Sequence, residues 1–267
     1  MEEAADAIGV KLRSFLHLVR DLIEVLPSTT EADWEDVDQL SYERPTVVLV
    51  SGFAATRRSL SVMRKRLRKD GFNVLILCLD WTNLSDGVRG LYRMAEKLST
   101  IVTQLRKQRG MQRNQIHLVA HSAGGLVARY YIQMLGGWHY CDSLVTLATP
   151  HQGTWLAALG LFTHLLLKFR CLFQLLPISP FIKHLNAAPL PEDFRLVSIF
   201  SKGDLMCPAR ATQLPPVLRS RVPSIELEEL GHSDFLWSKE SYEVLRGYLG
   251  VPAVSPTARQ EISENVD

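Results

Sequence analysis

One stretch of the chain, residues 115–125 with the sequence Q-I-H-L-V-A-H-S-A-G-G, restricts the fold more than any other. Its first part, Ile116 to Ala120, has the length of a buried strand, and an apolar helical pattern follows the glycines. A serine on a sharp turn between a buried strand and a helix forms a nucleophile elbow. The turn strains the serine backbone and brings helix and strand together, so the residues two before and two after Ser122 must be small. Ala120 and Gly124 meet this requirement.

The match to the elbow signature is incomplete. The usual pattern is G-x-S-x-G, whereas this chain has A-x-S-x-G. The departure leaves a second interpretation open, in which Ser122 only caps the helix of an ordinary strand–turn–helix unit. The rest of the sequence has to decide between the two.

The composition is that of a globular protein, with 46% apolar and 22% charged residues. A chain of 267 residues is long enough for one large α/β domain or two small ones. The net charge of +2 gives no reason to expect a nucleic-acid partner. The four cysteines are scattered without C-x-x-C spacing, so we expect no metal and no other cofactor.

The beginning of the sequence shows no secretory signal, because its first residues are acidic and no uninterrupted apolar core follows. No window reaches the roughly 20 apolar residues that span a bilayer. We therefore expect a soluble, cytoplasmic protein. Residues 9–26 form an amphipathic helical pattern, which either packs on its own domain or lies in a membrane interface. A peripheral membrane contact thus stays open.

Six short apolar runs alternate with helical patterns along the rest of the chain. This alternation predicts an α/β fold, with a mostly parallel central sheet of about six strands flanked by helices. The last run alternates in polarity, as a half-exposed edge strand does. The first run, residues 45–53, predicts a strand that ends in a tight loop, and the other predicted strands are residues 73–79, 116–120, 144–148, 195–200 and 224–228.

The chain divides into three predicted parts. Residues 1–40 hold the amphipathic helix and an acidic loop, 41–250 form the α/β domain, and 251–267 are a disordered tail. Within the domain, residues 155–185 are the most apolar part of the sequence. We interpret about 155–190 as a helical cap or lid over an apolar substrate, although a plain buried helical pair has the same composition.

Several polar residues directly follow predicted strands, and the carboxyl ends of parallel strands meet at one edge of a sheet. Ser122, Asp204 and His232 are among them, in the chain order expected for an elbow enzyme. A serine hydroxyl needs a base to take its proton, and the base needs a carboxylate to orient it. The sequence therefore predicts Ser122 as nucleophile, His232 as base and Asp204 as its partner.

Other acids and histidines compete for these roles. Asp234 is only two residues from His232 and is poorly placed to orient its ring, while Asp80 precedes the serine in the chain. His121 is adjacent to Ser122, and adjacent side chains on a tight turn point apart. His117 lies within a strand and is more simply a packed residue.

The tetrahedral intermediate of acyl transfer needs backbone N–H donors. Ala123 follows the nucleophile and supplies the first, and Phe53, in the loop after the first strand, supplies the second. We assign His151, Trp155 and Leu156 to the substrate pocket, since they lie at the start of the predicted cap.

Five stretches of the chain together resemble the α/β-hydrolase superfamily, and more narrowly bacterial triacylglycerol lipases and esterases. The resemblance implies the Ser122–Asp204–His232 triad, the Phe53 and Ala123 oxyanion hole, a sheet beginning near residue 46, and a lid after T-P-H-Q-G-T. This chain departs from the family at Ser51-Gly52, where H-G is usual. The stretches are residues 47–53, 118–130, 147–154, 201–208 and 230–235.

The sequence therefore predicts a serine hydrolase that cleaves carboxylic esters of lipid-like acyl chains. Its expected partner is a small-molecule or lipid ester, with no nucleic acid. Two alternatives remain: an acyltransferase on the same triad, and a non-catalytic lipid-binding protein of this fold. The oligomeric state and the acyl-chain length are left open.

Overall fold

The computed structural model describes residues 40–41, 44–52, 55, 57–78, 90–110, 115–159 and 171–250. The predicted amphipathic helix at 9–26, the acidic loop and the tail at 251–267 lie outside the described residues. The division of the chain into three parts therefore stays a prediction.

A six-stranded, wholly parallel sheet forms the centre of the protein, with the strand order β2-β1-β3-β4-β5-β6. This confirms the predicted fold class. Each strand coincides with one of the apolar runs of the sequence. The strands are β1 Thr46–Val50, β2 Asn73–Leu77, β3 Ile116–His121, β4 Ser143–Leu147, β5 Arg195–Ser201 and β6 Ser224–Leu227.

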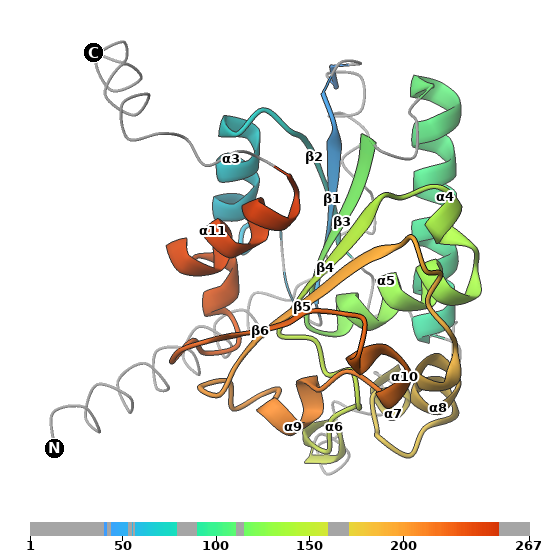
Figure 1. The fold of residues 1–267 in the computed structure, drawn as a ribbon, viewed down its shortest axis with the longest axis vertical. Helices are drawn as coiled ribbons and strands as arrows, with labels where there is room; N and C mark the ends of the chain where they lie inside the picture. The colour runs from blue at the N-terminus through green and yellow to red at the C-terminus, as the bar shows by residue number, and fades with distance from the viewer. Residues whose placement is uncertain are drawn as a thin grey trace, which may run out of the picture.

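Helices cover both faces of the sheet, so its inner strands are buried on both sides. In Figure 1, α4 (Gly90–Arg109) and α5 (Ala123–Met134) lie on one side, and α3 (Ser61–Lys69) and α11 (Lys239–Tyr248) on the other. The two apolar clusters of the core correspond to these two faces. All residues of β3 are buried, whereas β6 at the edge is only partly buried, as its alternating sequence predicts.

One helix, α5, begins earlier than the sequence suggests. Helix α5 starts at Ala123, directly after the elbow serine, although its first residues include two glycines that disfavour helix. Packing against the end of β1 outweighs that preference. Helix α3 starts at Ser61, and residues 57–60 before it form a turn.

Short helices gather at the end of the sheet where the strands terminate (Figure 1). Three of them, α6 (Leu156–Leu159), α7 (Cys171–Gln174) and α8 (Pro180–Ala187), come from the chain between β4 and β5. Two more, α9 (Ala209–Thr212) and α10 (Pro216–Arg219), follow β5. The lid role of about 155–190 stays a prediction, and residues 160–170 lie outside the description. Among the described helices, none has both the length and the apolar character that crossing a bilayer would require.

Candidate active site

Ser122 sits at the tip of a strained turn between β3 and α5. Its backbone has φ 54° and ψ −131°, a conformation that residues other than glycine rarely adopt. A Cβ atom at Gly124 would lie 2.3 Å from the carbonyl oxygen of Ser51, and one at Gly52 would lie 2.7 Å from the Ser122 Cβ. The small residues of the elbow are therefore required by the close approach of α5 and the β1 loop. The structure has the strained turn that the sequence predicts.

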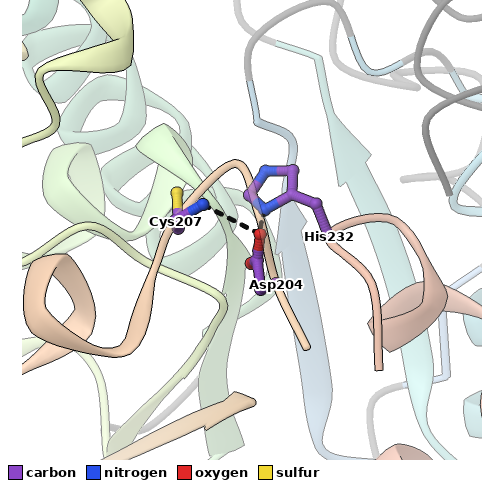
Figure 2. Close-up of side chains that lie close together, drawn as sticks. All are labelled: Asp204, Cys207 and His232. Carbon is purple, nitrogen blue, oxygen red and sulfur yellow. Dashed lines mark hydrogen bonds and ion pairs between the residues drawn. The ribbon is translucent and has the colours of Figure 1, made fainter. Parts of the chain in front are cut away.

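Three side chains from distant parts of the chain meet at this turn. The Oγ of Ser122 lies 2.9 Å from Nε2 of His232, and Nδ1 of His232 lies 2.8 Å from Oδ2 of Asp204. Figure 2 shows the imidazole of His232 directed at the Asp204 carboxylate. Because a carboxylate only accepts, Nδ1 carries a proton and Nε2 is left with a lone pair facing the serine hydroxyl. This is the geometry in which an imidazole takes a proton from serine.

Asp204 is held by its own loop. One carboxylate oxygen, Oδ1, accepts hydrogen bonds from the backbone N–H groups of Met206 and Cys207, both at 2.8 Å. The other oxygen is thereby left for His232. The side chain is 1% exposed, so its negative charge acts on the imidazole with little screening by water.

The electrostatics of the site favour a charged His232. Burial alone would lower the pKa of this imidazole, but the buried carboxylate of Asp204 outweighs that effect. The pKa of His232 is consequently raised well above its ordinary value of 6.5. A high pKa makes the imidazole a stronger base for the serine proton. It also means that a higher pH is needed before the imidazole is neutral and able to accept that proton.

His121, which precedes the serine, makes a contact that the sequence did not suggest. Its Nε2–H donates to the backbone carbonyl oxygen of His232 at 2.9 Å, and the two rings lie 4.8 Å apart. Burial and the nearby charge of His232 lower the pKa of His121 to about 3, so the ring stays neutral. His121 therefore holds the backbone that carries His232. Sequence reasoning missed this contact, which joins residues 111 positions apart.

The loops that carry Asp204 and His232 are joined by one hydroxyl group. Ser201 Oγ, at the end of β5, accepts hydrogen bonds from the N–H groups of Gly203 and Leu230, both at 3.0 Å. The competing acid Asp234 has a local role, since its Oδ2 accepts from Gly231 N–H at 2.8 Å. The other competing acid, Asp80, lies outside the described residues.

Solved structures with a similar fold include bacterial and archaeal hydrolases. The mature lipase BlEst2 of Bacillus licheniformis superposes with a TM-score of 0.63 at 15% identity, covering 79% of this chain and 94% of that one. A carboxylesterase of the thaumarchaeon Nitrososphaera gargenis gives 0.61 at 13% identity, over 83% and 93%. A monoacylglycerol lipase of Paleococcus ferrophilus gives 0.57 at 15%, over 78% and 96%.

The protein has the α/β-hydrolase fold. The resemblance inferred from the five sequence stretches is thereby confirmed at the level of the fold. The sequence model of the palmitoyl protein thioesterase family also matches this α/β-hydrolase chain, over residues 46–171. That segment runs from β1 through the elbow to the start of α7. No curated protein matches the sequence.

The structure describes only one of the two residues predicted to donate to the oxyanion. Ala123 is the first residue of α5, where backbone N–H groups have no partner within the helix and the helix dipole favours negative charge. Its N–H lies directly beside the serine. Phe53 lies outside the described residues, although Gly52 before it closely approaches the serine. The oxyanion hole stays a prediction.

The three residues predicted to line a substrate pocket differ in their exposure to solvent. His151 is fully buried, and its ring contacts Arg129, Thr146 and Ser198 at 3.2 Å each. It therefore lies within a buried polar cluster and offers no surface to a substrate. Trp155 is 59% exposed and Leu156 partly exposed at the start of α6, where contact with an apolar ligand remains our prediction.

Arg129 of α5 is the centre of that buried polar cluster. Among the described residues, its guanidinium donates to neutral acceptors: Gln133 Oε1, His151 Nδ1, Asn186 Oδ1 and the Leu185 carbonyl. Burial lowers its pKa to about 9. The cluster joins the elbow helix to α8, and neither its arginine nor its histidine was singled out for this role by the sequence.

Cys207 is a second residue that sequence reasoning missed. Its thiol lies against His232 and Ser122, and burial raises the pKa of that thiol. Together with Asp204 and His232 it forms a group whose ligand atoms lie within 4.8 Å of one another. The expectation of no metal rested on spacing between cysteines, which says nothing about a cysteine that meets a histidine from another loop.

Proposed function

We propose that this protein is a serine hydrolase that cleaves carboxylic esters of lipid-like acyl chains through an acyl-enzyme. Ser122 is the nucleophile, His232 the general base and acid, and Asp204 the group that orients the imidazole. The observation that carries the proposal is the continuous chain of hydrogen bonds from Ser122 Oγ through His232 to Asp204, at 2.9 and 2.8 Å. It starts from a serine with the strained backbone of an elbow.

Acylation follows from this arrangement. Nε2 of His232 takes the proton of the Ser122 hydroxyl while Oγ attacks the ester carbonyl carbon. The carbonyl oxygen becomes negative and accepts hydrogen bonds from the N–H of Ala123 and from a second donor that we assign to Phe53. The imidazolium then gives its proton to the leaving alcohol, and the acyl group remains on Oγ. Asp204 stabilises the imidazolium throughout.

Deacylation repeats the same steps with water. His232 takes a proton from a water molecule, whose oxygen attacks the acyl carbon, and returns the proton to Ser122 Oγ as the fatty acid leaves. If an alcohol replaces this water, the product is a new ester. The acyltransferase alternative therefore differs only in the group that reaches the acyl-enzyme.

Exposed apolar side chains support a lipid-like substrate. Five of the six large apolar residues exposed in the described part follow β4 in the chain, in or beside the short helices at the end of the sheet: Trp155, Phe173, Ile178, Leu205 and Val217. Exposed apolar surface of this kind is typical of contacts with lipids or acyl chains. Leu205 is 61% exposed and directly follows Asp204.

A thioester is the second candidate substrate, favoured by the match to the palmitoyl protein thioesterase model over residues 46–171. The same triad attacks a thioester carbonyl, and the leaving group is then a thiol. An acyl chain is common to both candidates, so only the bond beside the carbonyl distinguishes them.

The deciding experiment measures hydrolysis of p-nitrophenyl esters from acetate to palmitate, and of a palmitoyl thioester, by wild type and by Ser122→Ala. Loss of at least about a thousandfold in rate is expected for the variant. The chain-length optimum separates esterase from lipase, and the ratio of ester to thioester rates separates the two candidate substrates. Circular dichroism of the variant verifies that it is folded.

Three outcomes would contradict the proposal in different ways. Equal activity of both proteins means that Ser122 is not the nucleophile. A wild type that is acylated but turns over only with added alcohol is an acyltransferase. A wild type that neither hydrolyses any ester nor reacts with a fluorophosphonate is a non-catalytic protein of this fold.

A further inference from the structure

Beside the serine, the described residues bring a thiol, an imidazole and a carboxylate to one point. Cys207, His232 and Asp204 are 4%, 7% and 1% exposed, and one ligand atom from each lies within 4.8 Å of the others. Figure 2 shows Cys207 and Asp204 on one loop and His232 reaching them from another. The mechanism proposed above uses the carboxylate and the imidazole but gives the thiol no part.

The kind of ligand follows from the donor set. Mg²⁺ and Ca²⁺ select oxygen ligands, whereas Zn²⁺ binds thiolate sulfur, imidazole nitrogen and carboxylate oxygen. A site that offers a thiol and an imidazole, with a carboxylate beside them, therefore favours a thiophilic divalent cation. The separation of 4.8 Å is wider than the edges of a zinc tetrahedron with bonds of about 2.0–2.3 Å, so a small side-chain movement accompanies binding.

The hydrogen bonds decide which atoms are available. Nδ1 of His232 donates its proton to Asp204 Oδ2, so the free lone pair is on Nε2, which faces Ser122. The Cys207 thiol lies against the same ring and the same serine. A metal on Sγ and Nε2 would thus have Asp204 behind the imidazole, in the carboxylate–histidine–metal arrangement that strengthens histidine as a ligand.

We propose that Cys207 and His232 bind Zn²⁺ or a similar thiophilic cation at an inhibitory site, with Asp204 hydrogen-bonded to the far side of the imidazole. The inhibition, though not the binding, rests on the function proposed above. On binding, the Cys207 thiol releases its proton to solvent and Sγ bonds to the metal, while Nε2 of His232 donates its lone pair. The imidazole then has no lone pair for the Ser122 proton, and the hydroxyl loses its base. A chelator that removes the ion restores the lone pair and the activity.

Binding is tested without reference to catalysis by adding Co²⁺, a spectroscopic substitute for Zn²⁺, to the wild-type protein. We expect a thiolate-to-cobalt charge-transfer band that Zn²⁺ displaces and that Cys207→Val and Cys207→Ser both lack. Cys141→Val is the matched control, because Cys141 is equally buried but lies before β4, at the opposite end of the sheet. Two variants of Cys207 are used so that a folding defect in one leaves the other informative.

Inhibition is tested by ester hydrolysis with increasing Zn²⁺, each protein being compared with its own metal-free rate. The zinc concentration for half inhibition should rise by at least about tenfold in the Cys207 variants and stay unchanged in Cys141→Val. Equal zinc sensitivity of wild type and both Cys207 variants would overturn the proposal, as would a wild type without a cobalt–thiolate band.

The two proposals fail separately. An active hydrolase without Cys207-dependent metal binding keeps the proposed function and loses the metal site. A protein with the Cys207-dependent cobalt band but no activity toward any ester keeps the binding site and loses both the proposed function and the inhibition.

Discussion

Two buried histidines of this protein, His232 and His151, have similar surroundings and opposite electrostatics. Each is buried, and each has hydroxyl and charged side chains as partners of its ring nitrogens. Burial lowers the pKa of both. At His232 the Asp204 carboxylate reverses that effect and raises the pKa, whereas at His151 the Arg129 cation adds to burial and the pKa falls well below 6.5.

The comparison shows that the sign of one neighbouring charge separates a base from a structural residue. A cation beside His151 keeps its ring neutral, so that Nδ1 serves as an acceptor for Arg129. An anion beside His232 prepares its ring to become charged, which is what proton transfer from serine demands. Burial and hydrogen bonding alone do not distinguish the two sites.

The largest expected difference between the two histidines is in catalysis. His232→Ala removes the base and should lower the rate of ester hydrolysis roughly 10³–10⁶-fold, with the fold kept. His151→Ala should retain most of the activity of each folded molecule, because the ring contacts no reacting atom. The rates are normalised to the concentration of folded protein, which circular dichroism verifies for each variant. Equal losses in the two variants would remove the distinction drawn here.

A pH titration of the imidazole ¹⁵N signals sharpens the comparison. His232 should change protonation above 6.5, being charged below its pKa and neutral above it, so kcat/KM should rise with pH through the same midpoint. His151 should titrate below 6.5, and His121 near 3. In Asp204→Asn the carboxylate charge is gone and burial dominates, so the His232 midpoint should fall. If the His232 midpoint is unchanged in this variant, the Asp204 carboxylate is not what raises the pKa of the imidazole.

Arg129→Met tests the structural half of the comparison. The change leaves the acceptors on Gln133, Asn186 and Leu185 without their donor, and the free energy of unfolding in urea should fall by roughly 3 kcal/mol. Arg195→Met is the matched control, since that arginine is 54% exposed and its ion pair with Asp142 should contribute less than about 1 kcal/mol. An equal decrease in the free energy of unfolding in the two variants would mean that the buried hydrogen bonds of Arg129 contribute no more to stability than the exposed ion pair.

The smallest effect is expected from two buried serines of β5. Ser201→Ala removes the hydroxyl that accepts from both the acid loop and the base loop, so kcat should fall by only a few-fold, since Asp204 keeps its own backbone donors. Ser198→Ala removes a partner of His151 and should change stability while leaving kcat unaltered. The reverse pattern would show that the two loops are positioned independently of Ser201.

The fold was predictable because its strands are short apolar runs and parallel strands end at one edge. That single rule predicted that Ser122, Asp204 and His232 lie close together, although they are far apart in the chain. What the sequence did not reveal depends on packing between loops: the contact of His121 with His232, and the approach of Cys207 to the serine. Neither follows from local spacing, because each contact joins residues brought together only by the finished sheet.

His151 shows the opposite failure. Its position after β4 suggested a place at the substrate, but the side chain turns into the protein toward Arg129. Residues on the catalytic edge of a sheet can point inward as well as outward, and sequence position does not tell which. The buried Arg129, the seventh residue of α5, decides the direction here through a contact with a residue 22 positions away.

The backbone of Ser122 has a consequence for how such a protein changes over time. At φ 54° and ψ −131° glycine has a lower conformational energy than any residue with a side chain. A serine here therefore lowers the free energy of unfolding by about 1–3 kcal/mol. Once selection for the reaction is relaxed, a glycine at this position would be favoured for stability alone. A strained serine at this turn lowers stability, so only selection for the reaction would retain it.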